Sequence, residues 1–437
     1  MMMKKIQTEN GHMIGKDIYS LCEKMFPHCR SITGDGVRQT LKDLEELLPT
    51  LIIQEIPTGT KVFDWTVPKE WNIRNAWIKN ESGDKVLDFH QSNLHVLGYS
   101  APIDKVLSLS ELKEIIYTQP DQPELIPYVT SYYKERVGFC MSEQQKNSLP
   151  EGKYHAYIDS DLKDGSLTFG ELIIPGQCDR EIFLSTYICH PSLANDNLSG
   201  IAVLAYLGKW LSSLPKRRYT YRLIFVPETI GALSYLHLHY KYLKDHVIAG
   251  FNLSCVGDDR TYSYISSRYG NTLADKVAQN VLSLRYPAYK RYSFLKRSSD
   301  ERQYCAPEID LPLCMICRSK HMEYPEYHTS ADNLNLISPE GLQGSYEVYR
   351  DCLLVLENNR RYKTTCIGEP QLGKRGLYPT ISQKGSACSV ISMLDFLAYA
   401  DGTNDLIDIS HHIGVDIMKI LQITDLLKEH GLIKEMH

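Results

Sequence analysis

The hydrophobic pattern of the chain changes character several times between its ends. Between residues 13 and 52, apolar residues recur at the three- and four-residue spacing of amphipathic helices, in two groups separated by the turn-forming residues 31–36. From residue 63 to about residue 160, apolar segments are short and are interrupted by Gly, Pro, Asn and Asp, as in residues 75–78 and 95–98. The first region therefore predicts two helices, and the second predicts a β-rich unit of short strands and turns.

Longer apolar runs alternate in kind between about residues 171 and 360. Residues 182–188 and 221–226 have the length and the β-branched and aromatic content of buried strands, and residues 201–211 form an apolar run of helical length. Alternation of buried strands with helices is typical of a mostly parallel sheet that helices cover on both faces. We therefore expect an α/β fold for this part of the chain.

A separate small unit follows the linker at residues 369–379. Its apolar residues recur at helical spacing, a helix-start signal stands at residues 408–410, and a further helical run is followed by Gly431 and a short closing strand. From Glu369 to His437 there are six Lys or Arg against nine Asp or Glu. Because DNA-binding proteins draw much of their affinity from phosphate neutralisation, we expect no nucleic acid partner. The apolar segment 415–422 suits burial against the rest of the chain or in a homo-oligomer.

Composition limits the class of protein. A chain of 437 residues with 43% hydrophobic and 23% charged residues is expected to form two or three globular domains. The formal net charge of −5 favours neither nucleic acid nor an anionic membrane as a partner. No apolar signal sequence follows the first Met, and no run has the length of a membrane span, so we expect a cytoplasmic protein with reduced cysteines. The Cys-x-x-Cys pair at Cys314 and Cys317 lies in an apolar run, which favours buried packing.

Candidate chemistry collects where the predicted strands end. His190 and Asp196 lie on the loop between the strand at 182–188 and the helix at 201–211, and Glu228 directly follows the strand at 221–226. Ligands gather at the carboxyl edge of such sheets. His328 lies in a polar loop far along the chain and could complete a site begun by His190 and Asp196. Three donors with a nearby carboxylate that is not a ligand form the arrangement of a catalytic zinc site.

These motifs resemble those of a known family. His190 is followed by Asn195-Asp196-Asn197-Leu198-Ser199-Gly200, then by Glu-x-x-Gly at Glu228, then by Tyr-His-Thr-Ser-x-Asp around His328. This order is similar to that of the zinc aminopeptidases of peptidase clan MH, relatives of the bacterial leucyl aminopeptidases and glutaminyl cyclases. More narrowly, the chain resembles aminopeptidase-like proteins, associated with polysaccharide biosynthesis, that carry an inserted β domain and a C-terminal winged helix. That resemblance implies a zinc-exopeptidase-like sheet flanked by helices.

Three positions depart from the family pattern. Ser192 stands where an Asp orients the first His, Thr229 stands where a ligand Glu is usual, and Ser254 falls where a further ligand Asp is expected. Each metal of the usual pair has therefore lost one ligand of its own. The remaining set of His190, Asp196 and His328 suffices for one zinc ion per chain, with some rearrangement, because in the family the two His serve different metals.

The resemblance implies a metallohydrolase in which Glu228 is the general base. The expected substrate is a small peptide or an amino-sugar amide, and Asp300, Arg302 and Glu326 are the candidate substrate-binding residues. Two alternatives stay open at this point. One is an amidase or deacylase acting on an amino-sugar derivative in polysaccharide biosynthesis, and the other is a non-catalytic metal-binding regulator that acts through the winged helix.

The expected domain organisation follows from these regions. Residues 1–60 form the helical start of the catalytic domain, and residues 61–165 form the inserted β-rich domain. Residues 166–365 continue the catalytic domain, and residues 366–437 form the winged helix.

Overall fold

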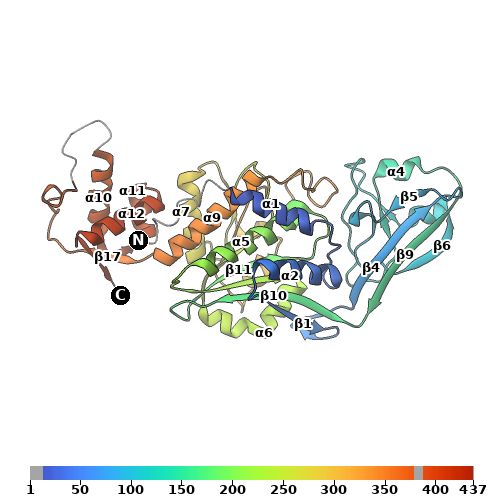
Figure 1. Cartoon of the computed structure of the whole chain (residues 1–437), viewed down its shortest axis with the longest axis horizontal. Coiled ribbons are helices and arrows are strands. Elements are labelled where there is room, and N and C mark those ends of the chain that lie inside the picture. Colours follow the sequence, from blue (N-terminus) through green and yellow to red (C-terminus); the bar gives the residue numbers. More distant parts are fainter. Residues whose placement is uncertain (1–12, 378–386, 437) are drawn as a thin grey trace.

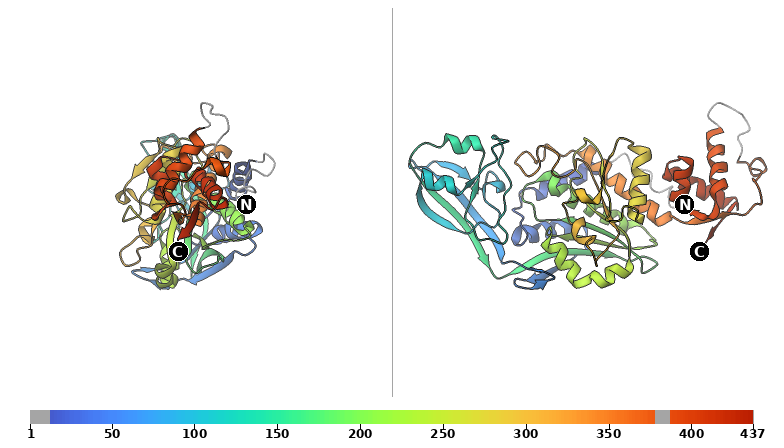
Figure 2. Two further views of the ribbon diagram at one scale, coloured as in Figure 1. Left: turned by 90° about the vertical axis from the view of Figure 1, so that its left-hand side faces the viewer. Right: turned by 180° about the vertical axis from the view of Figure 1, so that it is seen from behind.

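The computed structural model describes residues 13–377 and 387–436. The start of the chain, where no signal sequence is expected, and the end of the linker at residues 378–379 lie outside the described residues. Three units lie in a row along the long axis (Figure 1): a β-rich unit at one end, an α/β unit in the middle and a small, mainly helical unit at the other end. The view from behind in Figure 2 shows the same order.

An eight-stranded sheet forms the centre of the α/β unit. Its strand order is β1-β10-β12-β11-β13-β16-β14-β15. The four inner strands β12, β11, β13 and β16 are mutually parallel, and β1, β10 and β14 add antiparallel pairings towards the edges. The strands span β1 Ile52–Pro57, β10 Ser166–Ile174, β11 Glu181–Tyr187, β12 Thr220–Val226, β13 Val247–Asn252, β14 Ser263–Ile265, β15 Lys290–Tyr292 and β16 Leu313–Cys317. The expected α/β fold with a mostly parallel sheet is confirmed.

Helices cover both faces of this sheet because side chains alternate along each strand. On β11, Leu184 packs into the core beneath α1, α2, α5 and α9, whereas Phe183 packs into the core beneath α6 (Figure 1). The two predicted N-terminal helices are α1 and α2. The helices of this unit span α1 Ile14–Met25, α2 Asp35–Leu47, α5 Ser199–Ser213, α6 Ile230–His246, α7 Leu273–Arg285, α8 Glu301–Tyr304 and α9 Pro339–Asn358.

The β-rich unit is inserted between β1 and β10. Its main sheet is antiparallel, with the order β5-β4-β9-β6, and its buried apolar residues around Trp71, Ala76 and Ile158 are continuous with the core beneath α6. Its elements span β2 Lys61–Val62, β3 Trp65–Thr66, β4 Glu70–Lys79, β5 Lys85–Asp88, β6 Ile103–Ser108, α3 Leu109–Glu114, β7 Ile116–Tyr117, β8 Phe139–Cys140, α4 Glu143–Ser148 and β9 Lys153–Lys163.

Within the described residues, the C-terminal unit combines three α-helices with a three-stranded sheet of order β18-β17-β19. Asp416, at the start of α12, accepts a hydrogen bond from Arg285 of α7 at 2.8 Å, and Asn280 of α7 donates to Ser410 of α11 at 3.0 Å. These contacts dock the unit onto the central one. Its elements span β17 Arg361–Thr364, α10 Ala387–Tyr399, β18 Asp401–Asp405, α11 Leu406–Ile413, α12 Ile417–Glu429 and β19 Ile433–Met436.

Two further expectations concern cysteines and membrane spans. Cys314 and Cys317 are buried free thiols within β16, so their predicted packing role is confirmed. Among the described residues, no helix combines the length and apolar character needed to cross a bilayer.

Candidate metal centre

The predicted donors meet at the carboxyl edge of the central sheet. His190 follows β11, and Asp196 lies in the single irregular turn Ala194–Leu198 that leads into α5. Glu228 follows β12, the parallel neighbour of β11. His328 reaches the same point from the loop that follows β16. The topology therefore brings together residues that the sequence separates by up to 138 positions.

His190, Asp196 and His328 each present one donor atom, and these atoms all lie within 4.8 Å of one another. Asp196 Oδ2 and His328 Nε2 are 2.9 Å apart. Both atoms are buried, and neither has a hydrogen-bond partner of good geometry among the described residues. Buried donors that approach closely without bonding to each other fit joint coordination of a cation. Two imidazoles and a carboxylate suit zinc.

The protonation states of these donors suit metal binding. Burial lowers the pKa of His190 to about 4, so its imidazole is neutral at pH 7. Burial alone would raise the pKa of Asp196, but His190, His328 and the Tyr187 hydroxyl outweigh it and hold that pKa below its usual range. A neutral imidazole and an ionised carboxylate are the forms that ligate zinc.

Asp332 and Tyr187 hold the Asp196 turn in place. The Asp332 carboxylate accepts the backbone N–H groups of Asn195 at 2.6 Å and Asp196 at 3.1 Å. The Tyr187 hydroxyl donates to Asp196 Oδ1. All of these side chains are buried, so the turn is fixed by groups that have no water to compete for their hydrogen bonds. Asp332 is the last residue of the Tyr-His-Thr-Ser-x-Asp motif, but the motif did not indicate that it supports the Asp196 turn. The contribution of Tyr187 was not predicted from the sequence.

The three positions that depart from the family pattern are engaged in other contacts. Ser254 is hydrogen-bonded to the Tyr187 hydroxyl at 2.6 Å. Ser192 donates to the carbonyl oxygen of Phe26 at 3.0 Å. Thr229 accepts a hydrogen bond from Arg302 at 2.5 Å. The hydroxyls that replace carboxylates therefore form hydrogen bonds with the surrounding protein.

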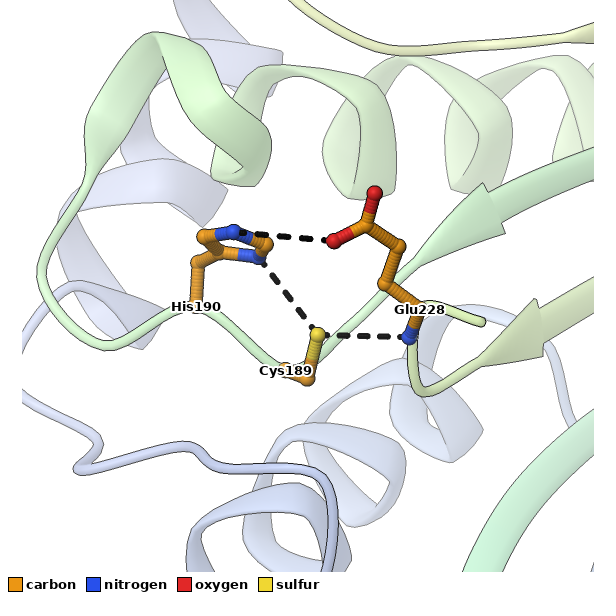
Figure 3. A group of neighbouring side chains, drawn as sticks. All are labelled: Cys189, His190 and Glu228. Atoms are coloured by element: carbon orange, nitrogen blue, oxygen red, sulfur yellow. Dashed lines mark hydrogen bonds and ion pairs between the residues drawn. The ribbon is translucent and has the colours of Figure 1, made fainter. Parts of the chain in front are cut away.

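Glu228 lies beside this set. Its carboxylate Oε2 is 4.0 Å from His190 Nε2, and its side chain is 24% exposed (Figure 3). No described residue donates a hydrogen bond to that carboxylate. Burial raises the pKa of Glu228 well above its usual value, and the like charges of Asp300 and Asp196 add to the effect. An accessible carboxylate with a raised pKa is suited to receiving and returning a proton.

Cys189 completes the group drawn in Figure 3. Its Sγ accepts the backbone N–H of Glu228 at 3.2 Å and lies 3.4 Å from His190 Nδ1. Cys189, His190 and Glu228 also form a three-donor group within 4.8 Å. Burial raises the pKa of the Cys189 thiol well above its usual value, and the thiol already holds the backbone of Glu228. The set with Asp196 and His328 therefore fits a metal better. Sequence reasoning missed Cys189, although its position next to His190 could have drawn attention to it.

The backbone is strained at this edge of the sheet. Ser192, Thr229, Cys255 and His328 have φ values of 45°, 61°, 53° and 56°, and positive φ values are uncommon for residues other than Gly. Such conformations cost about 1–3 kcal/mol each and cluster at functional sites. Four of them around one group of donors support a functional role for it.

The three candidate substrate-binding residues have different surroundings. Asp300 is fully buried and accepts the backbone N–H of Thr229 at 2.7 Å. Arg302 is exposed and donates a hydrogen bond to the hydroxyl of Thr229, the residue that follows Glu228. Glu326 forms a bidentate pair with Arg260 at 2.7 and 3.0 Å. All three therefore have protein partners, and Arg302 has the freest access to solvent.

The inserted unit also contributes to the site, which sequence reasoning did not anticipate. The Tyr128 ring lies 5.1 Å from the rings of both His190 and His328. Beside it, Pro127 forms an antiparallel bridge with Thr329. The Tyr128 hydroxyl is hydrogen-bonded to Tyr132 at 2.8 Å. Thus the insertion covers one side of the donor set with aromatic rings.

Comparison with known proteins identifies relatives that match almost the entire chain. A protein of Clostridium acetobutylicum, described as a candidate polysaccharide biosynthesis protein with an aminopeptidase-like domain, is 43% identical over 430 residues, which is 98% of each chain. A crystal structure of a candidate peptidase from the same organism superposes with a TM-score of 0.90 at 42% identity and covers 97% of both chains.

More distant structures share the fold of the central unit. BSAP, a zinc aminopeptidase from Bacillus subtilis, matches 80% of this chain and 96% of its own with a TM-score of 0.56 at 13% identity. A peptidase M28 precursor from Shewanella amazonensis matches 79% of this chain and 96% of its own with the same TM-score at 12% identity. The aminopeptidase-like fold expected from the motifs is therefore confirmed.

Family models account for nearly the whole chain. Residues 360–435 match a winged helix-turn-helix, which confirms the expected C-terminal module. Residues 19–359 match a domain of unknown function, DUF4910. The chain belongs to this DUF4910 family, and it joins an aminopeptidase-like fold to a C-terminal winged helix.

Proposed function

We propose that this protein is a zinc-dependent hydrolase of the aminopeptidase type that cleaves an amide bond. The observation that carries the proposal is the pair of buried, unbonded donor atoms Asp196 Oδ2 and His328 Nε2, with the accessible carboxylate of Glu228 beside His190. A metal held only for structure would have four protein ligands, whereas three ligands and a neighbouring free carboxylate are typical of catalysis.

His190, Asp196 and His328 would hold the ion. When bound there, zinc supplies Lewis acidity that polarises a substrate carbonyl and makes water more acidic. Glu228 accepts the proton of the attacking water and then donates it to the nitrogen of the leaving amine. A cation held by these residues would favour the ionised form of Glu228, whose pKa burial raises, so that its carboxylate can accept the proton. The Tyr128 ring excludes solvent from the imidazole side of the site.

The amide substrate has two candidate classes. The fold of the central unit favours a peptide or aminoacyl amide with a free amine. The description of the C. acetobutylicum relative as a polysaccharide biosynthesis protein favours an amide of an amino sugar, for which the chain would act as an amidase or deacylase. Both classes need the same attack of water on a carbonyl, so the proposed roles of the residues hold for either.

Three variants test the proposal. The purified wild-type protein should contain about one zinc per chain by elemental analysis. Glu228→Gln should retain that zinc and lower turnover by about 10²–10⁴-fold, because it removes only the proton acceptor. His190→Ala and His328→Ala should lose the zinc. The substrates are a panel of aminoacyl p-nitroanilides and a panel of N-acyl amino sugars.

Glu323→Gln is the matched control. It removes a carboxylate from the same loop as His328 but not from the donor set, so zinc content and turnover should stay near those of the wild type. Loss of zinc from Glu228→Gln would make Glu228 a ligand and contradict the mechanism. A zinc-loaded wild-type protein that hydrolyses neither panel would favour the non-catalytic regulator.

A further inference from the structure

Arg30 is a buried cation without a buried anion. It follows α1 and is 1% exposed. Its Nε–H donates to the carbonyl oxygen of His190 at 2.8 Å and its Nη1–H to that of Met25 at 2.6 Å. Nη2 is buried and has no hydrogen-bond partner among the described residues. No carboxylate of the described residues forms an ion pair with this guanidinium.

Arg222 shows how the same chain compensates a buried guanidinium elsewhere. Arg222 is 5% exposed, and it pairs with Glu171 at 2.5 Å and with Glu181 at 2.6 Å. Two buried carboxylates therefore face that cation. Removing a charge from water costs several kcal/mol unless an opposite charge or a full set of hydrogen bonds replaces the solvent. Arg30 has neither among the described residues.

The groups around Arg30 supply no negative charge. Burial raises the pKa values of the neighbouring Cys22 and Cys29 thiols to about 12, so both are neutral at pH 7. Burial also lowers the pKa of Arg30, to about 10, which still leaves the guanidinium charged at pH 7. The guanidinium of Arg30 therefore carries a positive charge that no described residue neutralises, and its Nη2–H groups have no acceptor among the described residues.

A small cavity adjoins this guanidinium. Its volume is about 10 Å³, and Arg30, Asn93, Val96, Tyr128 and Pro191 are among the residues that line it. Space of this size holds one water-sized particle. It is too small for a carboxylate or a phosphate, so the missing acceptor must be monatomic or a single water molecule. Only an anion also supplies the missing charge.

We propose that Arg30 binds a monatomic anion of the size of chloride in this cavity. The anion accepts the free Nη2–H and neutralises the buried guanidinium. Because Arg30 also donates to the carbonyl oxygen of His190, the same guanidinium links the anion to the loop that carries a candidate metal ligand. The anion site itself depends on Arg30 and the cavity, not on hydrolysis, so it can be tested on protein that shows no catalytic activity.

Bromide tests the site directly in the full-length wild-type protein. Crystals grown in sodium bromide without chloride should give an anomalous difference peak next to Arg30 Nη2, because bromide scatters anomalously and resembles chloride in size and charge. A density feature at that position without an anomalous signal would identify a water molecule and overturn the proposal. This measurement does not depend on any variant being stable.

Thermal unfolding tests occupancy in solution. The unfolding midpoint should rise saturably with sodium chloride relative to sodium gluconate at equal ionic strength, by about 1–2 °C for a tenfold excess over the dissociation constant. Arg30→Met should remove this chloride response, which is measured against the midpoint of the same variant in gluconate, because loss of the hydrogen bonds to the carbonyl oxygens of His190 and Met25 lowers that midpoint. Val96→Ile, which adds a methylene group at the cavity wall, should weaken the response.

Arg260→Met is the control, because Arg260 pairs with Glu326 at the surface, and its chloride response should match that of the wild type. An equal response in Arg30→Met would assign the effect to the protein surface in general and overturn the proposal. A bromide peak with no chloride response in solution would mean binding at crystal concentration only and would also overturn it.

Discussion

The backbone N–H of Tyr128 donates a hydrogen bond to the carbonyl oxygen of His328 at 2.8 Å. Tyr128 belongs to the inserted β-rich unit, and His328 is a candidate metal ligand of the central unit. The insertion is therefore joined to the donor set through the backbone as well as through the Tyr128 ring. Because the bond involves only main-chain atoms, substitutions of Tyr128 can test the ring while leaving this link intact.

Tyr128→Ala should weaken zinc binding. It removes the aromatic contacts with His190 and His328, and each such contact contributes about 0.5–1.5 kcal/mol. We expect about a tenfold loss of zinc affinity in competition with a chromogenic chelator. Tyr128→Phe keeps the ring and should bind zinc as the wild type does. An equal loss in both variants would assign the effect to the hydroxyl and its bond to Tyr132 instead.

Asp332→Ala should loosen the turn that carries Asp196. It leaves the buried N–H groups of Asn195 and Asp196 without their acceptor, at a cost of about 1–3 kcal/mol each. We expect a lower unfolding midpoint and a zinc affinity reduced by about 10–100-fold, as is usual when groups that orient metal ligands are removed. Asn335→Ala, at an exposed position of the same loop, should change neither quantity. Unchanged zinc affinity in Asp332→Ala would show that the turn holds its shape without this carboxylate.

Acid should weaken the junction between the insertion and α2. Arg38 of α2 forms two hydrogen bonds of 2.7 Å with Glu70 at the start of β4 and lowers the pKa of Glu70 to about 2. The unfolded value is about 4.3. Since the folded pKa is the lower one, the pair stabilises the fold fully above about pH 4.3, and the contribution is lost as the pH falls towards about 2.

The comparison of Glu70→Gln with the wild type measures this contribution. At pH 7 the variant should be less stable by about 1–3 kcal/mol, the value of charge-assisted hydrogen bonds, and the difference in unfolding midpoint should shrink as the pH approaches 3. Asp35→Asn removes an 80%-exposed partner of the same Arg38 and should have little effect at any pH. A difference between Glu70→Gln and the wild type that does not vary with pH would exclude the ion pair as its source.

The winged helix should not bind DNA. Within α12, Ile417, Ile420 and Leu421 are buried, and Asp416 at its start is paired with Arg285. Lys419 is the exposed cation of the segment 415–422. Residues 360–435, which match the winged helix, contain nine acidic and nine basic residues, so the unit has no net positive charge to attract phosphates. Gel-shift assays of the full chain on random duplex DNA at about 0.15 M salt should show no complex. A salt-sensitive complex that Lys419→Glu abolishes would contradict this prediction and support a regulator.

The parts of the site that lie at strand ends were predictable from the sequence. His190 and Glu228 directly follow apolar runs that could only be buried strands, and the parallel topology then places them side by side. The alternation of strands and helices predicted the fold class for the same reason. Short antiparallel additions such as β14 and β15 were not foreseen, because three residues carry no periodic signal.

Contacts between units could not be predicted in this way. Tyr128 lies in an irregular segment of the insertion, and its approach to His328 spans 200 positions of sequence. The burial of Arg30 depends on α1 packing against the His190 loop, and nothing in the residues around Arg30 signals it. Asp300 and Glu326 likewise bond to residues from distant segments of the chain. The hydrogen-bond partners of these two carboxylates therefore could not be predicted from their charge alone.

The pairing of β1 with β10 gives the insertion a further property. Pro57 and Ser166, the last and first residues of these strands, are direct partners in an antiparallel ladder, where opposed Cα atoms lie about 4.5–5.5 Å apart. The chain thus leaves the central unit and returns to it at almost the same point. A two-residue hairpin turn could close that gap in place of the intervening hundred or so positions. The β-rich unit could therefore be excised at a single point of the chain: its loss would open the imidazole side of the donor set to larger substrates and expose the apolar core that the two units share, while the eight-stranded sheet kept every strand.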